Sequence, residues 1–194
     1  GQSSLADGTV LVTGGVVGGA DSADVQSYDP VANTWTSKTS LPNVLKQHCQ
    51  STLNDGTVLV TGGRESSTRK DVVLSYDPAT DTWTTKTSMP ATRYRHSQST
   101  LTNGNVICAA GTSPSTTETD TVVSYITASN SWTTLNPLPR QGELHAQSSL
   151  ANNYVLITGG VTGATETNAV LLYAAGGETL TPGRAALLGY LAAN

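Results

Sequence analysis

The stretch "DGTVLVTGG" at residues 7–15 occurs again, letter for letter, at residues 55–63. Two weaker copies follow, "GNVICAAG" at 104–111 and "NYVLITGG" at 153–160, and the closing glycines of successive copies lie 48 or 49 residues apart. A fixed period of this length indicates a protein built from repeated structural units. Four units fill the chain, with approximate bounds at residues 1–46, 47–94, 95–143 and 144–194.

Each unit is predicted to contain four short β-strands, because β-branched runs such as "TVLVT" alternate with Asp-Gly or Asn-Gly turns. Gly8, Gly56 and Gly104 are expected to close the first hairpin of their units. Each unit also has a tyrosine followed seven residues later by a tryptophan, or by leucine in the last unit. We expect these rings to pack between neighbouring sheets. The pairs are Tyr28 and Trp35, Tyr76 and Trp83, Tyr125 and Trp132, and Tyr173 and Leu180.

The order of these features resembles the kelch repeat, with Gly-Gly after the second strand, "YDP" after the third and tryptophan in the fourth. The resemblance covers all four units and is strongest over residues 47–95. It implies an all-β fold, a β-propeller of four kelch-type four-stranded blades whose first strands line a central channel. We expect one domain over residues 1–194. It forms a four-bladed ring, part of a larger propeller, or an open set of blades that another chain completes.

Composition and charge exclude several classes of function. The net charge of −4 does not favour nucleic-acid binding. No apolar run approaches the ~18 residues of a membrane span. Cys49 and Cys108 allow at most one disulfide and lack the spacing of a metal site. With 12% charged residues and much Ser, Thr and Gly, the composition favours a secreted, extracellular protein.

All three histidines of the chain occupy the same position in their units, and each precedes a glutamine by two residues. Because strand side chains alternate, histidine and glutamine share one face. Three roles are open: a structural bond to the backbone of the next blade, a metal site, or a ligand site. The pairs are His48 and Gln50, His96 and Gln98, and His145 and Gln147.

The stretch "RYRHSQST" at 93–100 is similar to an inner strand of the galactose oxidase-like copper radical oxidases, which also have kelch blades. That resemblance implies His96, with His48 or His145, as copper ligands and Tyr94 as the redox tyrosine. Arg95 separates Tyr94 from His96, whereas the tyrosine and histidine are adjacent in that family. Copper belongs only to this alternative, and otherwise no cofactor is expected.

The loops between the second and third strands and those entering each first strand emerge on one face, where variable loops usually bind partners. A basic group there is the candidate binding site, and its residues are Arg64, Arg69, Lys70, Arg93, Tyr94 and Arg95. It suits an acidic peptide, a carboxylated glycan or a neighbouring subunit.

No catalytic residues are expected, because the chain has no nucleophile elbow, phosphate loop or zinc-protease motif. The sequence therefore favours a non-enzymatic module that recognises a protein or glycan, or that builds a homo-oligomer or filament through its blade edges. A lectin and a copper oxidase are the alternatives.

Overall fold

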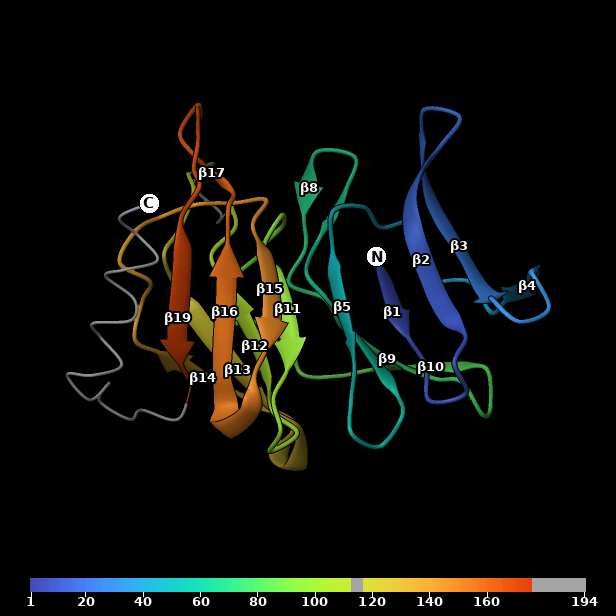
Figure 1. The fold of residues 1–194 in the computed structure, drawn as a ribbon. Helices are drawn as coiled ribbons and strands as arrows, with labels where there is room; N and C mark the ends of the chain where they lie inside the picture. Colours follow the sequence, from blue (N-terminus) through green and yellow to red (C-terminus); the bar gives the residue numbers. More distant parts are fainter. Residues whose placement is uncertain (113–116, 176–194) are drawn as a thin grey trace. The chain divides into compact units, whose positions relative to one another are not determined.

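A computed structural model of the chain describes residues 1–112 and 117–175 (Figure 1). The chain divides into two compact units, Gly1–Arg95 and His96–Asn194. The described elements are β-strands and two short 3-10 turns, Thr127–Ser129 and Ala151–Asn153. The predicted all-β class is therefore confirmed, while the single domain stays a prediction. Within the described ranges, no helix has the length and apolar character needed to cross a membrane.

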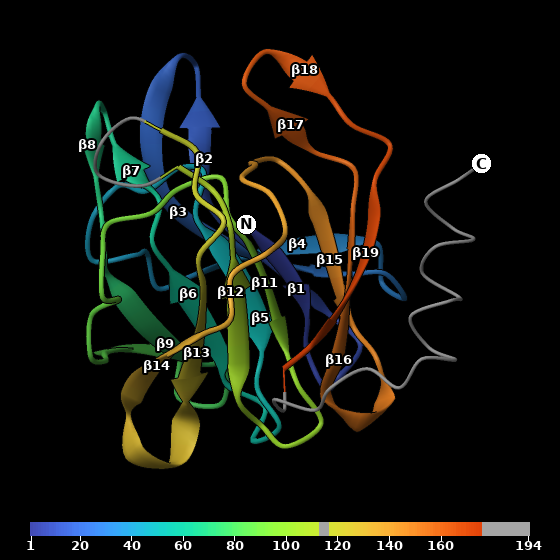
Figure 2. The same cartoon turned by 90° about the vertical axis from the view of Figure 1, so that its left-hand side faces the viewer.

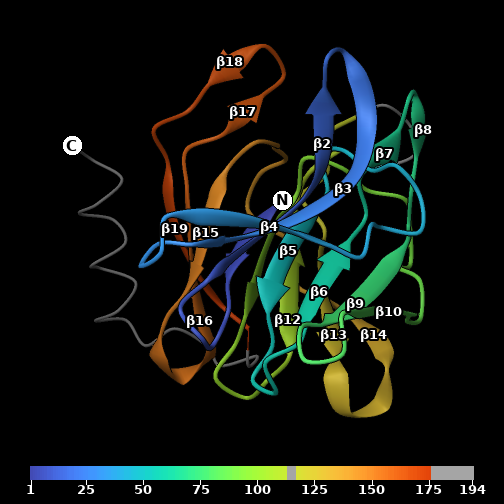
Figure 3. The same cartoon turned by 90° about the vertical axis from the view of Figure 1, so that its right-hand side faces the viewer.

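The first sheet, blade 1, is antiparallel, and its strands follow the chain order. A bulge between Thr13 and Gly15 bends the second strand at Gly14, which has φ of 53°. Beyond it the second and third strands continue as a long hairpin (Figure 3). The strands are β1 (Gln2–Ser4), β2 (Val10–Val17), β3 (Ala20–Asp29) and β4 (Thr34–Lys38).

Blade 2 repeats this order in the same unit. Its first turn shows why the repeat keeps Asp-Gly: Gly56 has φ of 86°, and the Asp55 carboxylate accepts the Thr57 backbone N–H at 3.0 Å. The strands are β5 (Cys49–Thr52), β6 (Val58–Thr61), β9 (Val73–Asp77) and β10 (Thr82–Thr85). A small hairpin, β7 (Arg64–Glu65) and β8 (Thr68–Arg69), connects β6 to β9.

The second unit holds blades 3 and 4. Blade 3 consists of β11 (Ser97–Thr100), β12 (Val106–Ala109), β13 (Val122–Ile126) and β14 (Ser131–Leu135). Blade 4 consists of β15 (Ala146–Ser149), β16 (Tyr154–Thr158) and β19 (Val170–Ala174). The hairpin of β17 (Val161–Thr162) and β18 (Thr165–Glu166) extends beyond β16 and β19 (Figure 2). The outer strand predicted around Leu180 lies outside the described residues.

Each unit has its own apolar core between its two blades. In the first unit, Leu11 and Val25 of blade 1 cluster with Val58 and Val60 of blade 2. The core of the second unit uses equivalent positions, which are Leu101, Ile107, Ala109 and Val122 of blade 3 and Val155 and Ile157 of blade 4. Because strand side chains alternate, one face of each blade supplies these residues, and each such burial contributes about 1.5–3 kcal/mol.

The tyrosine and tryptophan of each of the first three units pair across neighbouring strands, with ring centroids 4.9, 4.9 and 5.2 Å apart. The predicted burial between sheets holds for Tyr76, which is fully buried, but not for Trp35, which is 57% exposed. Each tyrosine hydroxyl also donates to a side chain five residues later. These acceptors have left-handed backbone and are Asn33, Asp81 and Asn130.

We expect Tyr76→Phe to lower the free energy of unfolding by ~1 kcal/mol, because the buried ring loses its hydrogen bond to Asp81. Tyr28→Phe is the matched control, since the equivalent bond to Asn33 is exposed. Urea unfolding of both variants measures the difference. Equal losses in both variants would contradict the idea that burial of the tyrosine increases the contribution of this hydrogen bond to stability.

Candidate functional site

In the first unit, a histidine of blade 2 bonds to a hydroxyl of blade 1. His48 Nε2 lies 2.8 Å from Thr13 Oγ1, and the Thr13 hydroxyl donates to the side-chain oxygen of Gln50. Because the single hydroxyl proton goes to Gln50, the imidazole must be the donor through its Nε2–H. His48 is therefore the donor in this bond, and its side chain is buried, with 6% exposure.

Gln50 completes this contact with the preceding blade. Its amide nitrogen donates to Ser3 Oγ at 3.0 Å and to the Leu11 carbonyl at 3.1 Å. We call the histidine and glutamine the His-Gln clamp. We call the groups that bond to the clamp the His-Gln socket. In blade 1 these groups are the hydroxyls of Thr13 and Ser3 and the carbonyl of Leu11.

The second unit repeats the clamp between blades 3 and 4. The Ser97 hydroxyl lies 2.5 Å from His145 Nε2 and donates to the side-chain oxygen of Gln147 at 2.5 Å. The amide nitrogen of Gln147 donates to Ser99 Oγ at 2.7 Å and to the Ile107 carbonyl at 3.2 Å. By the same proton count, His145 also donates through Nε2.

The socket hydroxyl comes from different strands in the two units, from β2 as Thr13 and from β11 as Ser97. That the hydroxyl can come from either of the first two strands was not predicted, although the sequence contains a pattern that indicates it. In each blade, one pair of residues faces each other at this position of the first two strands, and one member of the pair, a threonine or serine, has a side-chain hydroxyl. These facing pairs are Gly1 and Thr13, Cys49 and Thr61, Ser97 and Ala109, and Ala146 and Thr158.

These contacts show what His48 and His145 bond to in the structure. His48 and Gln50 share a strand face, as expected, because both reach Thr13. Through Nε2, His48 and His145 each bond to a hydroxyl of the preceding blade. His96, the first residue of the second unit, is 4% exposed.

The contacts of His48, His145 and Tyr94 do not fit the copper centre that the galactose oxidase-like resemblance implies. His48 and His145 use Nε2 as a donor, so a metal at that atom would have to replace both its proton and its hydrogen bond. Tyr94 has arginines around its ring, and their charge disfavours a metal cation there. Within residues 1–112 and 117–175, no three His, Cys, Asp or Glu side chains form a metal-binding group.

Three arginines of the predicted basic group surround one phenol ring. The guanidinium carbons of Arg64, Arg69 and Arg95 lie 5.3, 5.6 and 5.4 Å from the ring centroid of Tyr94. These distances are those of cation–π contacts. Arg64 and Arg69 pair across the β7–β8 hairpin, which brings these two arginines side by side. We call these four residues the Tyr94 cluster.

The two other basic residues of the group lie differently. Arg93 is 4% exposed, and its backbone accepts the Gly63 N–H at 2.7 Å and donates to the Lys70 carbonyl at 3.0 Å. The Lys70 ammonium lies 2.7 Å from the Glu65 carboxylate. The structure therefore brings together Arg64, Arg69, Tyr94 and Arg95, buries Arg93 and pairs Lys70.

The residue before each histidine has left-handed backbone, which the sequence did not signal. Gln47, Arg95 and Leu144 have φ of 54°, 55° and 58°. This conformation is costly for residues with a Cβ, and it recurs where the chain turns into each first strand. Leu144 is 57% exposed.

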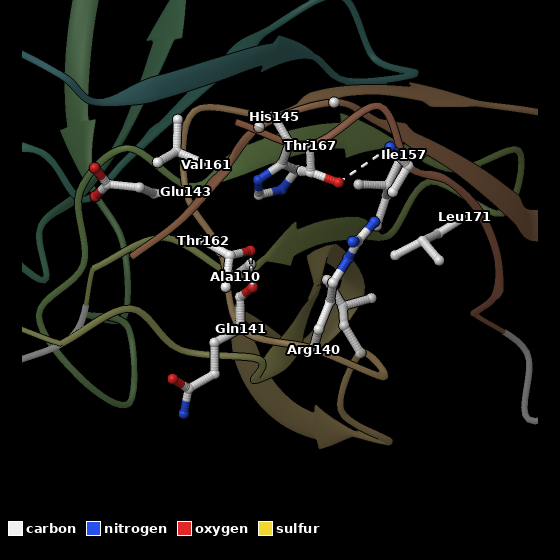
Figure 4. Close-up of a pocket in the computed structure, with 15 residues that line it drawn as sticks. Ala110, Arg140, Gln141, Glu143, His145, Ile157, Val161, Thr162, Thr167 and Leu171 are labelled. Carbon is white, nitrogen blue, oxygen red and sulfur yellow. Dashed lines mark hydrogen bonds between the residues drawn. The ribbon is translucent and has the colours of Figure 1, made fainter. Parts of the chain in front are cut away.

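A cavity of about 20 Å³ lies in the second unit beside His145 and Arg140 (Figure 4). That volume holds about one water molecule and no substrate. The Glu143 carboxylate points away from the imidazole and accepts a hydrogen bond from the Thr112 hydroxyl. The cavity therefore gives no support to a catalytic reading of these residues.

Acidic pH should weaken the first unit through His48. Burial, and secondarily the charge of the N-terminus, lower the pKa of His48 from 6.5 to about 3. The unfolded chain then binds a proton that the folded chain does not, so stability falls as the pH decreases from about 6.5 toward 3. In His48→Gln, which keeps a donor toward Thr13, we expect a weaker pH dependence over this range. Urea midpoints at several pH values compare the two proteins, and identical slopes would contradict the assignment.

Leu144→Asn should raise the free energy of unfolding by ~0.5–1 kcal/mol, because asparagine adopts the left-handed region more readily than leucine. Leu150→Asn is the control, since Leu150 is also an exposed leucine of this blade but has φ of −115°. Thermal unfolding measures both. A loss of stability in Leu144→Asn would show that the leucine side chain, and not backbone strain, decides this position.

Comparison with known proteins agrees with the geometry. The Kelch motif matches residues 4–42 and 48–90, which cover most of blades 1 and 2. No curated protein matches the chain. Blade 3 has the four-strand order of the matched blades, and the three described strands of blade 4 follow the same order. A His-Gln clamp joins the two blades of each unit. The first unit therefore carries two Kelch motifs, and the sheets of the second unit repeat the contacts of the matched blades.

Proposed function

We propose that this kelch-repeat protein is a non-enzymatic recognition module, and that the Tyr94 cluster binds an acidic segment of a partner protein. The arrangement of three guanidinium groups around one phenol ring supports this assignment. Kelch propellers generally serve as protein-binding or structural modules. An extracellular location, expected from the composition, is part of the proposal.

The charge around the cluster favours an anionic ligand. The whole chain has a net charge of −4, yet three arginines gather at one ring. Two nearby carboxylates are engaged by lysines: Asp21 lies 2.5 Å from Lys46, and Glu65 lies 2.7 Å from Lys70. The local field is therefore positive in an otherwise acidic protein, which attracts carboxylates at long range.

The geometry of the arginines favours carboxylates over neutral ligands. A guanidinium group that stacks on a ring keeps the N–H donors at its edge, and that edge matches a carboxylate in a bidentate contact. Arg64 Nε is buried, and no residue in the described ranges accepts its hydrogen bond. Stacking on the ring also restricts the rotamers before binding, which lowers the entropic cost of ordering them.

A lectin function is less well supported. Sugars stack on open aromatic faces, whereas the Tyr94 ring is in contact with three guanidinium groups. A carboxylated glycan presents carboxylates, as an acidic peptide does, but it has a sugar backbone in place of a peptide backbone. Binding measurements with both ligand types therefore separate the two sources of carboxylate.

We expect the protein to bind a fluorescent oligoglutamate peptide, and Arg69→Gln to weaken this binding about tenfold or more, because a charge-assisted hydrogen bond is lost. Fluorescence anisotropy at low and high salt measures the affinity. Tyr94→Leu should also weaken binding, because the arginines lose the ring that orients them. Arg140→Gln, which removes the same charge from the second unit, is the control and should bind normally.

Equal affinities of Arg69→Gln and the unchanged protein would overturn the site. Stronger binding of oligogalacturonate than of oligoglutamate would instead assign the cluster to a carboxylated glycan. Binding of neutral oligosaccharides that survives Arg69→Gln would favour a lectin.

A further inference from the structure

The long hairpin of blade 1 contacts the hairpin that carries two arginines of the Tyr94 cluster. Asp21 lies on the β2–β3 hairpin, and its Oδ2 accepts the Ser66 backbone N–H at 2.5 Å. Ser66 lies in the turn between β7 and β8, and Arg64 pairs with Arg69 at the base of that hairpin. A carboxylate of one blade thus holds the turn of the neighbouring hairpin (Figure 3).

The same carboxylate has a second partner on the segment that enters blade 2. Its Oδ1 lies 2.5 Å from the Lys46 ammonium, and the Asp21 side chain is 10% exposed. The backbone of Lys46 exchanges two hydrogen bonds with that of Arg64, at 2.9 and 3.0 Å. The bond to Lys46, followed by the bond to Ser66, lowers the pKa of Asp21 from its ordinary value, so the group is an anion at neutral pH. Asp21 therefore contacts both the turn of the β7–β8 hairpin and the residue that pairs with its first strand.

The β7–β8 hairpin is short and depends on contacts of this kind. Its strands have two residues each and form a sheet of their own. A two-stranded hairpin is marginally stable in water by itself, so contacts with the rest of the protein decide its orientation. Arg64 and Arg69 reach the Tyr94 ring from this hairpin, with guanidinium carbons 5.3 and 5.6 Å from the ring centroid. The orientation of the hairpin therefore sets where these two guanidinium groups lie.

The second unit contains an equivalent contact between hairpins. The Glu118 carboxylate accepts the Gly163 backbone N–H at 2.8 Å, and Gly163 lies in the turn between β17 and β18. Glu118 precedes Gly163 by 45 residues, and Asp21 precedes Ser66 by the same number. A contact that recurs with one spacing is a feature of the fold. In the first unit, the hairpin that it holds also carries the arginines.

We propose that Asp21 is a positioning residue of the Tyr94 cluster. By holding the turn at Ser66, it fixes the β7–β8 hairpin so that Arg64 and Arg69 present their N–H donors to the carboxylates of an acidic partner segment. Donors that are held in place lose less conformational entropy on binding than mobile ones. This role rests on the proposed function, since it concerns the same ligand. Blade 1 would thus contribute to recognition of the ligand by the cluster.

The sign of the effect on binding distinguishes positioning from charge. Asp21 is an anion near the cluster, and the positive charge of Arg64 is one of the causes that lower its pKa. If charge alone matters, removal of the carboxylate strengthens the attraction of an acidic ligand. If the carboxylate positions the arginines, its removal weakens binding.

We expect Asp21→Ala to bind the fluorescent oligoglutamate peptide about fivefold more weakly than the unchanged protein, because the hairpin loses the hydrogen bond that holds its turn. Asp24→Ala is the matched control, since it removes the same charge from an exposed position of the same strand. It should bind as tightly as the unchanged protein or more tightly. Asp21→Glu should keep the affinity to within about twofold, because glutamate makes this contact in the second unit. Fluorescence anisotropy at low and high salt measures all four affinities.

Hydrogen exchange gives a readout that needs no ligand. The Ser66 amide should exchange faster in Asp21→Ala than in the unchanged protein or in Asp24→Ala. Asp21→Glu should restore its protection. Circular dichroism checks that every variant is folded.

Binding by Asp21→Ala that equals or exceeds that of the unchanged protein would overturn the positioning role and leave the proposed function standing. Equal weakening in Asp21→Ala and Asp24→Ala, or unchanged exchange of the Ser66 amide in Asp21→Ala, would also overturn this role alone. Absence of oligoglutamate binding in the unchanged protein would overturn the proposed function, and the positioning role with it.

Discussion

The contact on which each unit depends is the His-Gln clamp, in which one hydroxyl accepts from an imidazole and donates to an amide. Thr13 fills this role for blades 1 and 2, and Ser97 fills it for blades 3 and 4. Hydrophobic burial between two sheets has little direction, so it does not by itself fix how one sheet slides on the other. A buried hydrogen-bond network has fixed donors and acceptors and therefore specifies one register.

The clamp also explains why histidine recurs at this position. The side chain must be neutral in the interior, must donate through Nε2 and must reach a hydroxyl on the neighbouring sheet. His48 meets these conditions, because burial lowers its pKa to about 3 and keeps it uncharged at neutral pH. In His48 and His145 the donated hydrogen bond occupies Nε2, so these two histidines hold neighbouring blades together in the structure.

The Tyr94 cluster and the His-Gln clamp are distributed differently along the chain. The clamp recurs in both units. Within residues 1–112 and 117–175, the Tyr94 cluster has no second copy, and it lies where the β7–β8 hairpin of blade 2 meets the segment that enters the next repeat. Repeated residues thus maintain the interfaces between blades, and residues that depart from the repeat create a local surface. This division is expected of repeat scaffolds, where binding concentrates in loops carried by rigid sheets.

The sequence by itself determined the number of repeats, the strand class and the turn positions, because period, alternation and Asp-Gly chemistry are local properties of the chain. It also placed Arg64, Arg69, Tyr94 and Arg95 in one group. Only the tertiary structure decided that three of these surround the fourth while Arg93 is buried, and that Thr13 and Ser97 perform one role from different strands. Hydrogen-bond partners and burial depend on which sheets face each other, and residues 35 to 50 positions apart in the chain meet only after the blades have packed.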